Sequence, residues 1–202
     1  MHSLLTAPPP RPWRCARAGR RAGRLTLAFA FSLAAAAALS PAPAAAHVSL
    51  EQPEAGADMA YKAVFRIGHG CDGSATHTVG VRLPPGFAGA RPMPKPGWSV
   101  EVRRAPLAEP YESHGQRVTE DVVEVTWRAQ ARDAWLADAH FDEFVLRGQT
   151  PRQPGDLWFK VQQLCEKGRW DWAEIPQPGA PRPKAPAVLL RVLPAAAAAH
   201  QH

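Results

Sequence analysis

Short segments of this chain alternate between apolar and polar residues, as strands do when they bury one face. In residues 61–67, for example, the apolar residues Tyr61, Phe65 and Ile67 share one face. The pattern recurs at 76–83, 98–103, 123–127, 141–147, 156–164 and 170–175, with Pro- and Gly-rich turn signals between the segments. About seven or eight such strands predict an all-β fold, an antiparallel β-sandwich. The only helix candidate, residues 133–139, is a turn or two long.

The first 46 residues have the layout of a secretory signal. Arginines precede an uncharged apolar run at 25–39, and small residues follow it up to Ala46. We expect cleavage after Ala46, so that the mature chain begins at His47. The alternative is an uncleaved anchor, but this run is shorter than the roughly 20 residues a bilayer requires, and Pro41 and Pro43 follow it. Arg20-Arg21 leaves open whether export is general or of the twin-arginine type.

The net charge of +6 belongs to the signal segment. Residues 1–46 hold six arginines and no acidic residue, so 18 basic residues remain to balance the 18 acidic ones. Nucleic-acid binding requires clustered Lys and Arg, which the mature chain lacks. We therefore expect no nucleic-acid partner, and no membrane span after cleavage.

Two cysteines remain in the mature chain, Cys71 and Cys165. An even pair in an oxidising compartment favours one disulfide, which would close a loop of about 95 residues. The rival interpretation makes the two sulfurs soft copper ligands.

The composition changes after residue 176. Prolines, a run of alanines and a terminal His-Gln-His predict a disordered tail over 177–202, beyond a domain of 47–176. His200 and His202 could bind metal weakly. Within the tail, the apolar segment 187–193 is too short to cross a bilayer and could dock on the sandwich or on a neighbour.

An N-terminal His47 would offer its α-amine and its ring Nδ1 to one metal ion, a chelate that suits copper. The alternative is that histidine stands there by accident of the cleavage point. Glu143, between Phe141 and Phe144, is a candidate carboxylate ligand; the alternative is a salt bridge to an arginine such as Arg128 or Arg147. Trp172 is a further candidate, although tryptophans of this kind are more often core residues. Glu51 is the alternative carboxylate, but at i+4 in a strand it would lie more than about 10 Å from His47.

The sequence gives little indication of other metal sites or of enzymatic activity. The remaining histidines show no metal-ligand spacing, and motifs of hydrolases or phosphate-binding loops are absent from the sequence. The histidines concerned are His69, His77, His114 and His140.

Taken together, several stretches of the mature chain resemble the YcnI-like copper-binding domain in its Gram-negative form. They lie at 47–55, 61–66, 69–74, 95–98, 141–145, 165–168 and 172–176. The resemblance implies a sandwich of immunoglobulin or cupredoxin type that binds Cu(II) through a single-histidine brace. In it His47 supplies amine and imidazole, Glu143 matches the coordinating glutamate, and Trp172 matches the tryptophan beside the copper. Trp170 also precedes it, so two tryptophans compete for one role.

The resemblance further implies a periplasmic copper-handling protein without enzymatic activity, working near a copper chaperone or importer. Two other classes remain. One is a histidine-brace copper oxidase or monooxygenase, which would recruit a second histidine such as His69, His77 or His140. The other is a scaffold or adhesion sandwich that binds no metal.

Overall fold

The computed structural model describes residues 47–194. The predicted signal segment 1–46 lies outside the described residues, as does the end of the predicted tail with His200 and His202.

The described part of the chain is built almost entirely of strands. In chain order the elements are β1 (Ser49–Leu50), β2 (Glu54–Gly56), β3 (Ala60–Ile67), β4 (Thr76–Arg82), β5 (Ala88–Pro92), β6 (Trp98–Ser113), β7 (Gln116–Ala129), a short 3-10 helix η1 (Arg132–Ala134), β8 (Asp142–Gln149), β9 (Gly155–Cys165), β10 (Arg169–Trp172) and β11 (Val188–Leu193).

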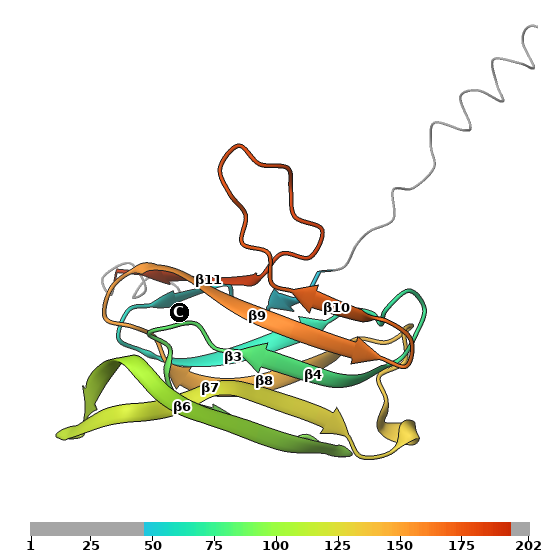
Figure 1. The fold of residues 1–202 in the computed structure, drawn as a ribbon, viewed down its shortest axis with the longest axis horizontal. Helices are drawn as coiled ribbons and strands as arrows, with labels where there is room; N and C mark the ends of the chain where they lie inside the picture. Colours follow the sequence, from blue (N-terminus) through green and yellow to red (C-terminus); the bar gives the residue numbers. More distant parts are fainter. Residues whose placement is uncertain (1–46, 195–202) are drawn as a thin grey trace, which may run out of the picture. The chain divides into compact units, whose positions relative to one another are not determined.

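These strands form two sheets (Figure 1). One has the order β1-β3-β8-β5; the other has the order β2-β11-β9-β4-β7-β6, with β10 beside β9. Neighbouring strands run antiparallel except β2 and β11, which are parallel. The predicted all-β sandwich is therefore confirmed, with one parallel pair added.

The core lies between the sheets and follows the predicted alternation. On β3 the side chains of Tyr61, Phe65 and Ile67 are buried, whereas Arg66 is exposed. The ring of Phe65 meets that of Phe159 on β9 edge to face, with centroids 5.3 Å apart. Such contacts add to the burial of apolar area that holds two sheets together.

Two elements differ in length from the prediction. The expected helix at 133–139 is only the three-residue η1. The strand expected at 98–103 continues as β6 to Ser113 and pairs with β7 across a tight turn at His114 and Gly115. Both turn residues have a positive φ, 48° for His114 and 74° for Gly115. The two-residue turns that join hairpin strands commonly require this conformation, which glycine adopts most readily.

The predicted domain end at residue 176 is wrong. Strand β11 pairs with β9 on one side and β2 on the other, and buries Val188, Leu190 and Val192. The proline-rich composition belongs to the loop between β10 and β11, which Figure 1 shows rising from the sheet. The composition of residues 177–202 as a whole indicates disorder, whereas the six residues of β11 within it have the composition of a buried strand.

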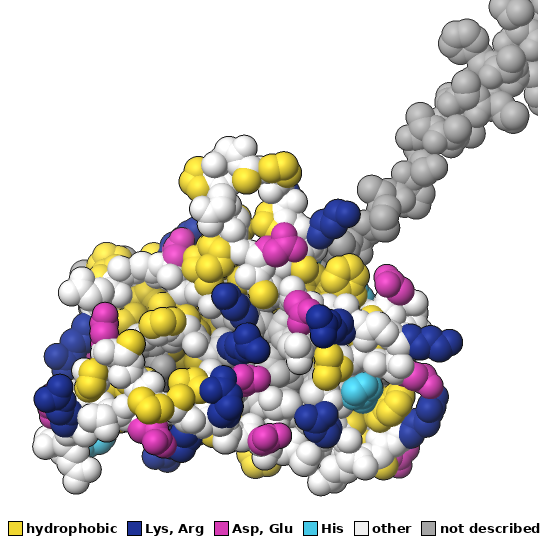
Figure 2. Space-filling model, viewed as in Figure 1, with side chains coloured by type: hydrophobic (Ala, Val, Ile, Leu, Met, Phe, Trp, Pro, Cys, Tyr) yellow, Lys and Arg dark blue, Asp and Glu magenta, His cyan; other side chains and the backbone are white. Residues whose placement is uncertain are grey.

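Basic and acidic side chains intermingle on the face shown in Figure 2. Many are paired: Arg103 and Arg82, for example, approach Glu124 at 2.7 and 3.6 Å. Among the described residues, no helix is long and apolar enough to cross a membrane.

If β11 is part of the core, Leu190→Ala should lower the free energy of unfolding by about 2–5 kcal/mol, because it leaves a cavity between the sheets. Leu189→Ala, a half-buried neighbour on the other face of the strand, should cost clearly less. Chemical denaturation measures both. Equal, small losses would mean that β11 is dispensable.

Candidate metal centre

The N-terminal segment is fixed immediately after His47. Val48 and Leu50 are each only 6% exposed, and β1 pairs with β3. The hydroxyl of Tyr61 donates to the carbonyl of Gln52 at 2.5 Å, and burial raises the pKa of this tyrosine well above its usual value. The phenol therefore stays protonated and anchors the turn that follows β1. His47 is held at one edge of the sandwich.

His47 lies against Trp172, a tryptophan of the opposite sheet. Their rings meet edge to face, with centroids 5.7 Å apart and planes at 89°. Trp172 is 2% exposed, and His47 is half-buried. Two predicted site residues more than 120 positions apart in the sequence are thus brought together.

The two candidate tryptophans have different places. Trp170 stacks on Trp172, with ring centroids 5.2 Å apart, and its Nε1 is the one buried side-chain nitrogen or oxygen without a hydrogen bond in the described part of the chain. Trp172 donates its Nε1 proton to Gln163. Since an indole N–H can only donate, Trp172 presents carbon atoms, not a nitrogen ligand, to its surroundings.

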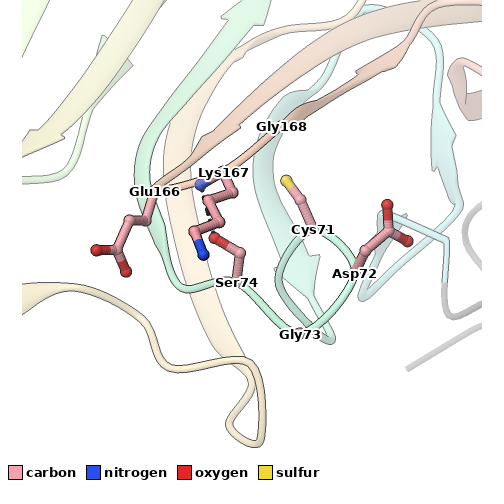
Figure 3. A pocket seen from close by; sticks show the side chains of 7 residues that line it. All are labelled: Cys71, Asp72, Gly73, Ser74, Glu166, Lys167 and Gly168. Carbon is pink, nitrogen blue, oxygen red and sulfur yellow. Dashed lines mark hydrogen bonds between the residues drawn. The ribbon is translucent and has the colours of Figure 1, made fainter.

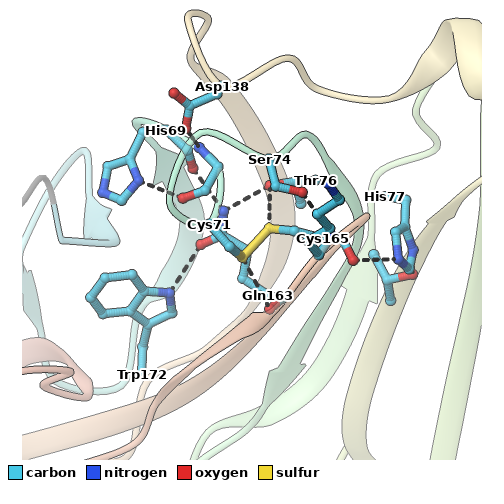
Figure 4. Close-up of a disulfide and its surroundings, with 12 residues drawn as sticks. His69, Cys71, Ser74, Thr76, His77, Asp138, Gln163, Cys165 and Trp172 are labelled. Atoms are coloured by element: carbon cyan, nitrogen blue, oxygen red, sulfur yellow. Dashed lines mark hydrogen bonds between the residues drawn. A yellow bond between two sulfur atoms is a disulfide. The ribbon is translucent and has the colours of Figure 1, made fainter.

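Gln163 is the polar centre of this region (Figure 4). It is 1% exposed, and its Oε1 accepts from Trp172 Nε1 at 3.1 Å. Its Nε2 donates to the carbonyl of His69 at 2.7 Å and to Thr76 Oγ1 at 2.8 Å. One buried amide therefore joins β9, β10 and the segment after β3. We call His47, His69, Gln163 and Trp172 the N-terminal cluster.

The disulfide Cys71–Cys165 is present, with Cα atoms 5.9 Å apart. It ties the loop after β3 to the end of β9, beside Gln163 (Figure 4). The prediction of a disulfide is confirmed. The rival interpretation, soft copper ligands, is wrong because both sulfurs are used in the bond.

His69 belongs to the cluster, although sequence spacing gave it no role. Its ring lies 6.5 Å from that of Trp172, centroid to centroid, and its Nδ1 is 2.6 Å from the carbonyl oxygen of Gly70. Figure 4 shows both rings on the same side of the disulfide. The signal that could have found it is the Cys71 disulfide, which holds the His-Gly-Cys loop in place.

Glu143 does have an arginine partner, and it is Arg66 on β3, not Arg128 or Arg147. Arg66 Nε approaches Glu143 Oε1 at 3.1 Å, and Arg66 Nη2 approaches Glu51 Oε1 at 2.9 Å. The Glu143 side chain keeps 39% of its exposure, so it is less desolvated than its aromatic neighbours suggested. One guanidinium thus holds both candidate carboxylates.

In register, Ser49, Arg66 and Glu143 form one row across β1, β3 and β8. This row places Glu143 two strands, or about 10 Å, from the N-terminal strand. The structure therefore brings Trp172 to His47 directly, and connects Glu143 to the N-terminal strand through Arg66.

The chain can be compared with known proteins on this basis. The family described as "Domain of unknown function (DUF1775)" matches residues 47–192. The chain belongs to the DUF1775 family. The match extends through most of β11, in agreement with the core described above.

Among solved structures, the DUF1775 domain is similar to an uncharacterized protein from Nocardia farcinica with an immunoglobulin-like fold. The two are 24% identical with a TM-score of 0.58, over 72% of this chain and 97% of the other. This likeness shows an immunoglobulin-like fold. A type II cohesin domain from the cellulosome of Acetivibrio cellulolyticus also matches, at 8% identity and a TM-score of 0.33, over 72% and 94% of the chains. No curated protein matches.

Two further polar side chains of the DUF1775 domain, His77 and the buried Asp121, are engaged elsewhere. His77 contacts Thr78 and the carbonyl of Cys165 through its two ring nitrogens. Asp121, the most buried carboxylate, accepts hydrogen bonds from Gly89 N and Tyr111 Oη, and burial, reinforced by this bond, raises the pKa of Tyr111 to about 12. Within residues 47–194 no three His, Cys, Asp or Glu side chains group as a metal site. A histidine brace needs no such trio, because one residue supplies two donors.

The pocket in Figure 3 lies where the turn after Cys71 meets the turn after Cys165. Ser74 Oγ accepts a hydrogen bond from the backbone nitrogen of Lys167 at 2.7 Å, which closes the two turns on each other. This contact supports the loop that carries His69.

Gln163→Leu should lower the free energy of unfolding of the DUF1775 domain by at least about 3 kcal/mol. The substitution leaves Trp172 Nε1 and the His69 carbonyl buried without partners, and leaves Thr76 Oγ1 with only the sulfur of Cys165 at 3.5 Å, at about 1–3 kcal/mol each. Gln162→Leu is the matched control, since Gln162 is exposed and bonds only to Asp171. Denaturation curves of equal midpoint for the two variants would contradict the role given to Gln163.

Proposed function

We propose that this DUF1775 domain binds Cu(II) through the α-amine and imidazole of His47, after export and cleavage behind Ala46, and that it serves copper handling in the periplasm. The observation that carries the proposal is the packing of the His47 ring on buried Trp172, directly before an anchored strand. The resemblance to the YcnI-like copper-binding domain supports it.

The chemistry depends on cleavage. In the uncleaved chain the His47 nitrogen is a peptide amide, which does not offer the lone pair of an amine. Once freed, the amine and the ring Nδ1 can close a chelate on a metal that prefers nitrogen donors in a tetragonal arrangement, as Cu(II) does. Removal of the export signal would then also create the metal site.

Trp172 would shield the ion without coordinating it. Its Nε1 proton is committed to Gln163, so the carbon surface of the ring faces His47. An aromatic wall at this place excludes water and limits the ways in which the imidazole can turn. A cation beside an indole also gains some electrostatic stabilisation.

Glu143 would supply the carboxylate. Arg66 occupies its Oε1, which leaves Oε2 as the donor. Since Arg66 also binds Glu51, coordination by one carboxylate would shift the guanidinium toward the other. Glu143 could thus turn an oxygen to the metal while Arg66 keeps its ion pair with Glu51.

We propose carriage or buffering of copper rather than catalysis. A second candidate function is a histidine-brace copper oxidase, and the observation that favours it is the position of His69 beside Trp172. Turnover of dioxygen by the copper-loaded protein distinguishes the two.

Protein that begins at His47 should give a tetragonal, nitrogen-rich Cu(II) electron paramagnetic resonance spectrum, and one extra N-terminal methionine should remove most of the affinity. Copper must displace the amine proton, and a free α-amine has a pKa near 8. Affinity should therefore fall by about tenfold per pH unit below about pH 7.5, as the protonated amine competes with the metal. Identical spectra and affinities with and without the extra residue would refute the brace.

Glu143→Gln should weaken Cu(II) binding at least about tenfold, since even residues behind the ligands of a metal site typically contribute that much. Glu51→Gln is the matched control, because it removes a carboxylate bound to the same arginine. Titration calorimetry of both variants, each beginning at His47, gives the comparison. The reverse order of effects would assign the carboxylate to Glu51.

A further inference from the structure

We propose that this protein forms a two-fold symmetric dimer, in which strand β6 pairs antiparallel with β6 of a second copy, centred on Val102. The proposal concerns an interaction surface and does not depend on the copper site. Three observations carry it: the open edge of the larger sheet, the apolar side chains exposed at that edge, and the order of charges along the strand.

Strand β6 is the last strand of the larger sheet. Within residues 47–194 only β7 pairs with it (Figure 1). Gln130 N donates to the carbonyl of Gly97 at 2.9 Å, just before β6 begins. The antiparallel alternation that continues from this pair turns the backbone groups of Val100 and Val102 away from β7. Such a row of N–H and C=O groups along an edge is a template for another strand.

Apolar side chains are exposed along this edge. Val102 is 41% exposed, although it shares the inward face of β6 with the buried Trp98. Met93, which follows β5 at the edge of the other sheet, is 50% exposed. Its carbonyl accepts a hydrogen bond from the indole of Trp127, the β7 residue opposite Val100. Two of the five large apolar side chains exposed in the described part of the chain therefore lie at this open side of the sandwich, and grouped apolar exposure is typical of an interaction surface.

The charges beside Val102 favour a second copy as the partner. Glu101 and Arg103 lie on the outward face of β6, and both are exposed. When two copies pair antiparallel about Val102, each Glu101 lies opposite Arg103 of the other copy, once on either side of the two-fold axis. Glu101 forms no salt bridge with another residue of 47–194, and Arg103 keeps an exposed side chain while it approaches Glu124 at 2.7 Å. Opposite charges in facing cross-strand positions are stabilising.

The same charges disfavour the neighbouring registers. Pairing centred on Glu101 or on Arg103 would bring two identical charges together, which is destabilising. Pairing centred on Val100 would set Glu101 opposite Ser99 and Arg103 opposite Gly97, so that neither charge gains a partner. The order Glu-Val-Arg thus selects one register of a symmetric pair.

The stretch that would pair lacks the usual protection of an edge strand. Edge strands that avoid pairing commonly carry proline, lysine or a bulge. Between Ser99 and Ala105, β6 has neither proline nor lysine, and the extra residue at the irregularity after Arg103 is Val123 of β7. Pro106 ends the stretch, since it has no N–H to donate. Seven residues span only about 23 Å, so we expect a small interface and a dissociation constant on the order of 10–100 μM.

Sedimentation equilibrium of protein that begins at His47, with a chelator present and at concentrations from about 5 μM to about 1 mM, tests the proposal. Glu101→Arg and Arg103→Glu each place like charges opposite each other, whereas the double variant restores opposite charges with their positions exchanged. Glu109→Arg is the matched control, because it makes the same change of charge at an exposed position of β6 beyond Pro106. Denaturation curves check that each variant is folded.

We expect the unsubstituted protein and Glu109→Arg to dimerise equally. Each single variant should dimerise at least about tenfold more weakly, because two attractive pairs become repulsive, and the double variant should return to within about threefold of the unsubstituted protein. A protein that stays monomeric at the highest concentration would overturn the proposal, whatever the variants do. Dimerisation that both single variants leave unchanged, or a double variant as weak as the single ones, would also overturn it. Because copper is absent, all these outcomes are separate from the test of the His47 site.

Discussion

The buried side-chain amide of Gln163 holds together the segments on which the candidate site depends. It satisfies the indole N–H of Trp172, the carbonyl of His69 and the hydroxyl of Thr76 in a place that water does not reach. Because a buried polar group without a partner is costly, these groups stabilise one arrangement and penalise the others. The disulfide beside Gln163 adds a covalent restraint to the same loop.

The proposed function depends on the position of the N-terminal segment of the described chain. β1 has only two residues, but Val48 and Leu50 are buried and the following turn is hydrogen-bonded to Tyr61. His47 is thus placed by the sandwich and would receive its free amine from a peptidase. Both donors of the proposed brace would then lie beside Trp172, which is already buried in the sandwich. In the proposed site, the rigid part would be protein core, and the reactive amine would be created on cleavage.

Much of this fold could be predicted because alternation reports directly which face of a strand is buried. The face of β3 with Tyr61, Phe65 and Ile67 is an example. β11 was not predicted as a strand, although its apolar segment was expected to dock on the sandwich or on a neighbour. The prolines and alanines that flank it dominated the composition of the region. The disulfide followed from the number of cysteines, but the place of His69 did not. Its role depends on pairing between strands and on a glutamine 94 positions away, neither of which leaves a spacing pattern in the sequence.

The same limit applies to the carboxylate. A salt bridge from Glu143 to an arginine was one of two interpretations of the sequence. The choice of Arg66 is set by the register of β3 against β8, and the second acid on that arginine follows β1. Local sequence cannot give a row of side chains across three strands.

A crystal structure of protein beginning at His47, grown with Cu(II) and measured at the copper absorption edge, tests the central claim most directly. The claim predicts an anomalous peak bonded to the amine and Nδ1 of His47, beside the ring of Trp172. A peak on other residues, with the His47 amine uncoordinated, would contradict it.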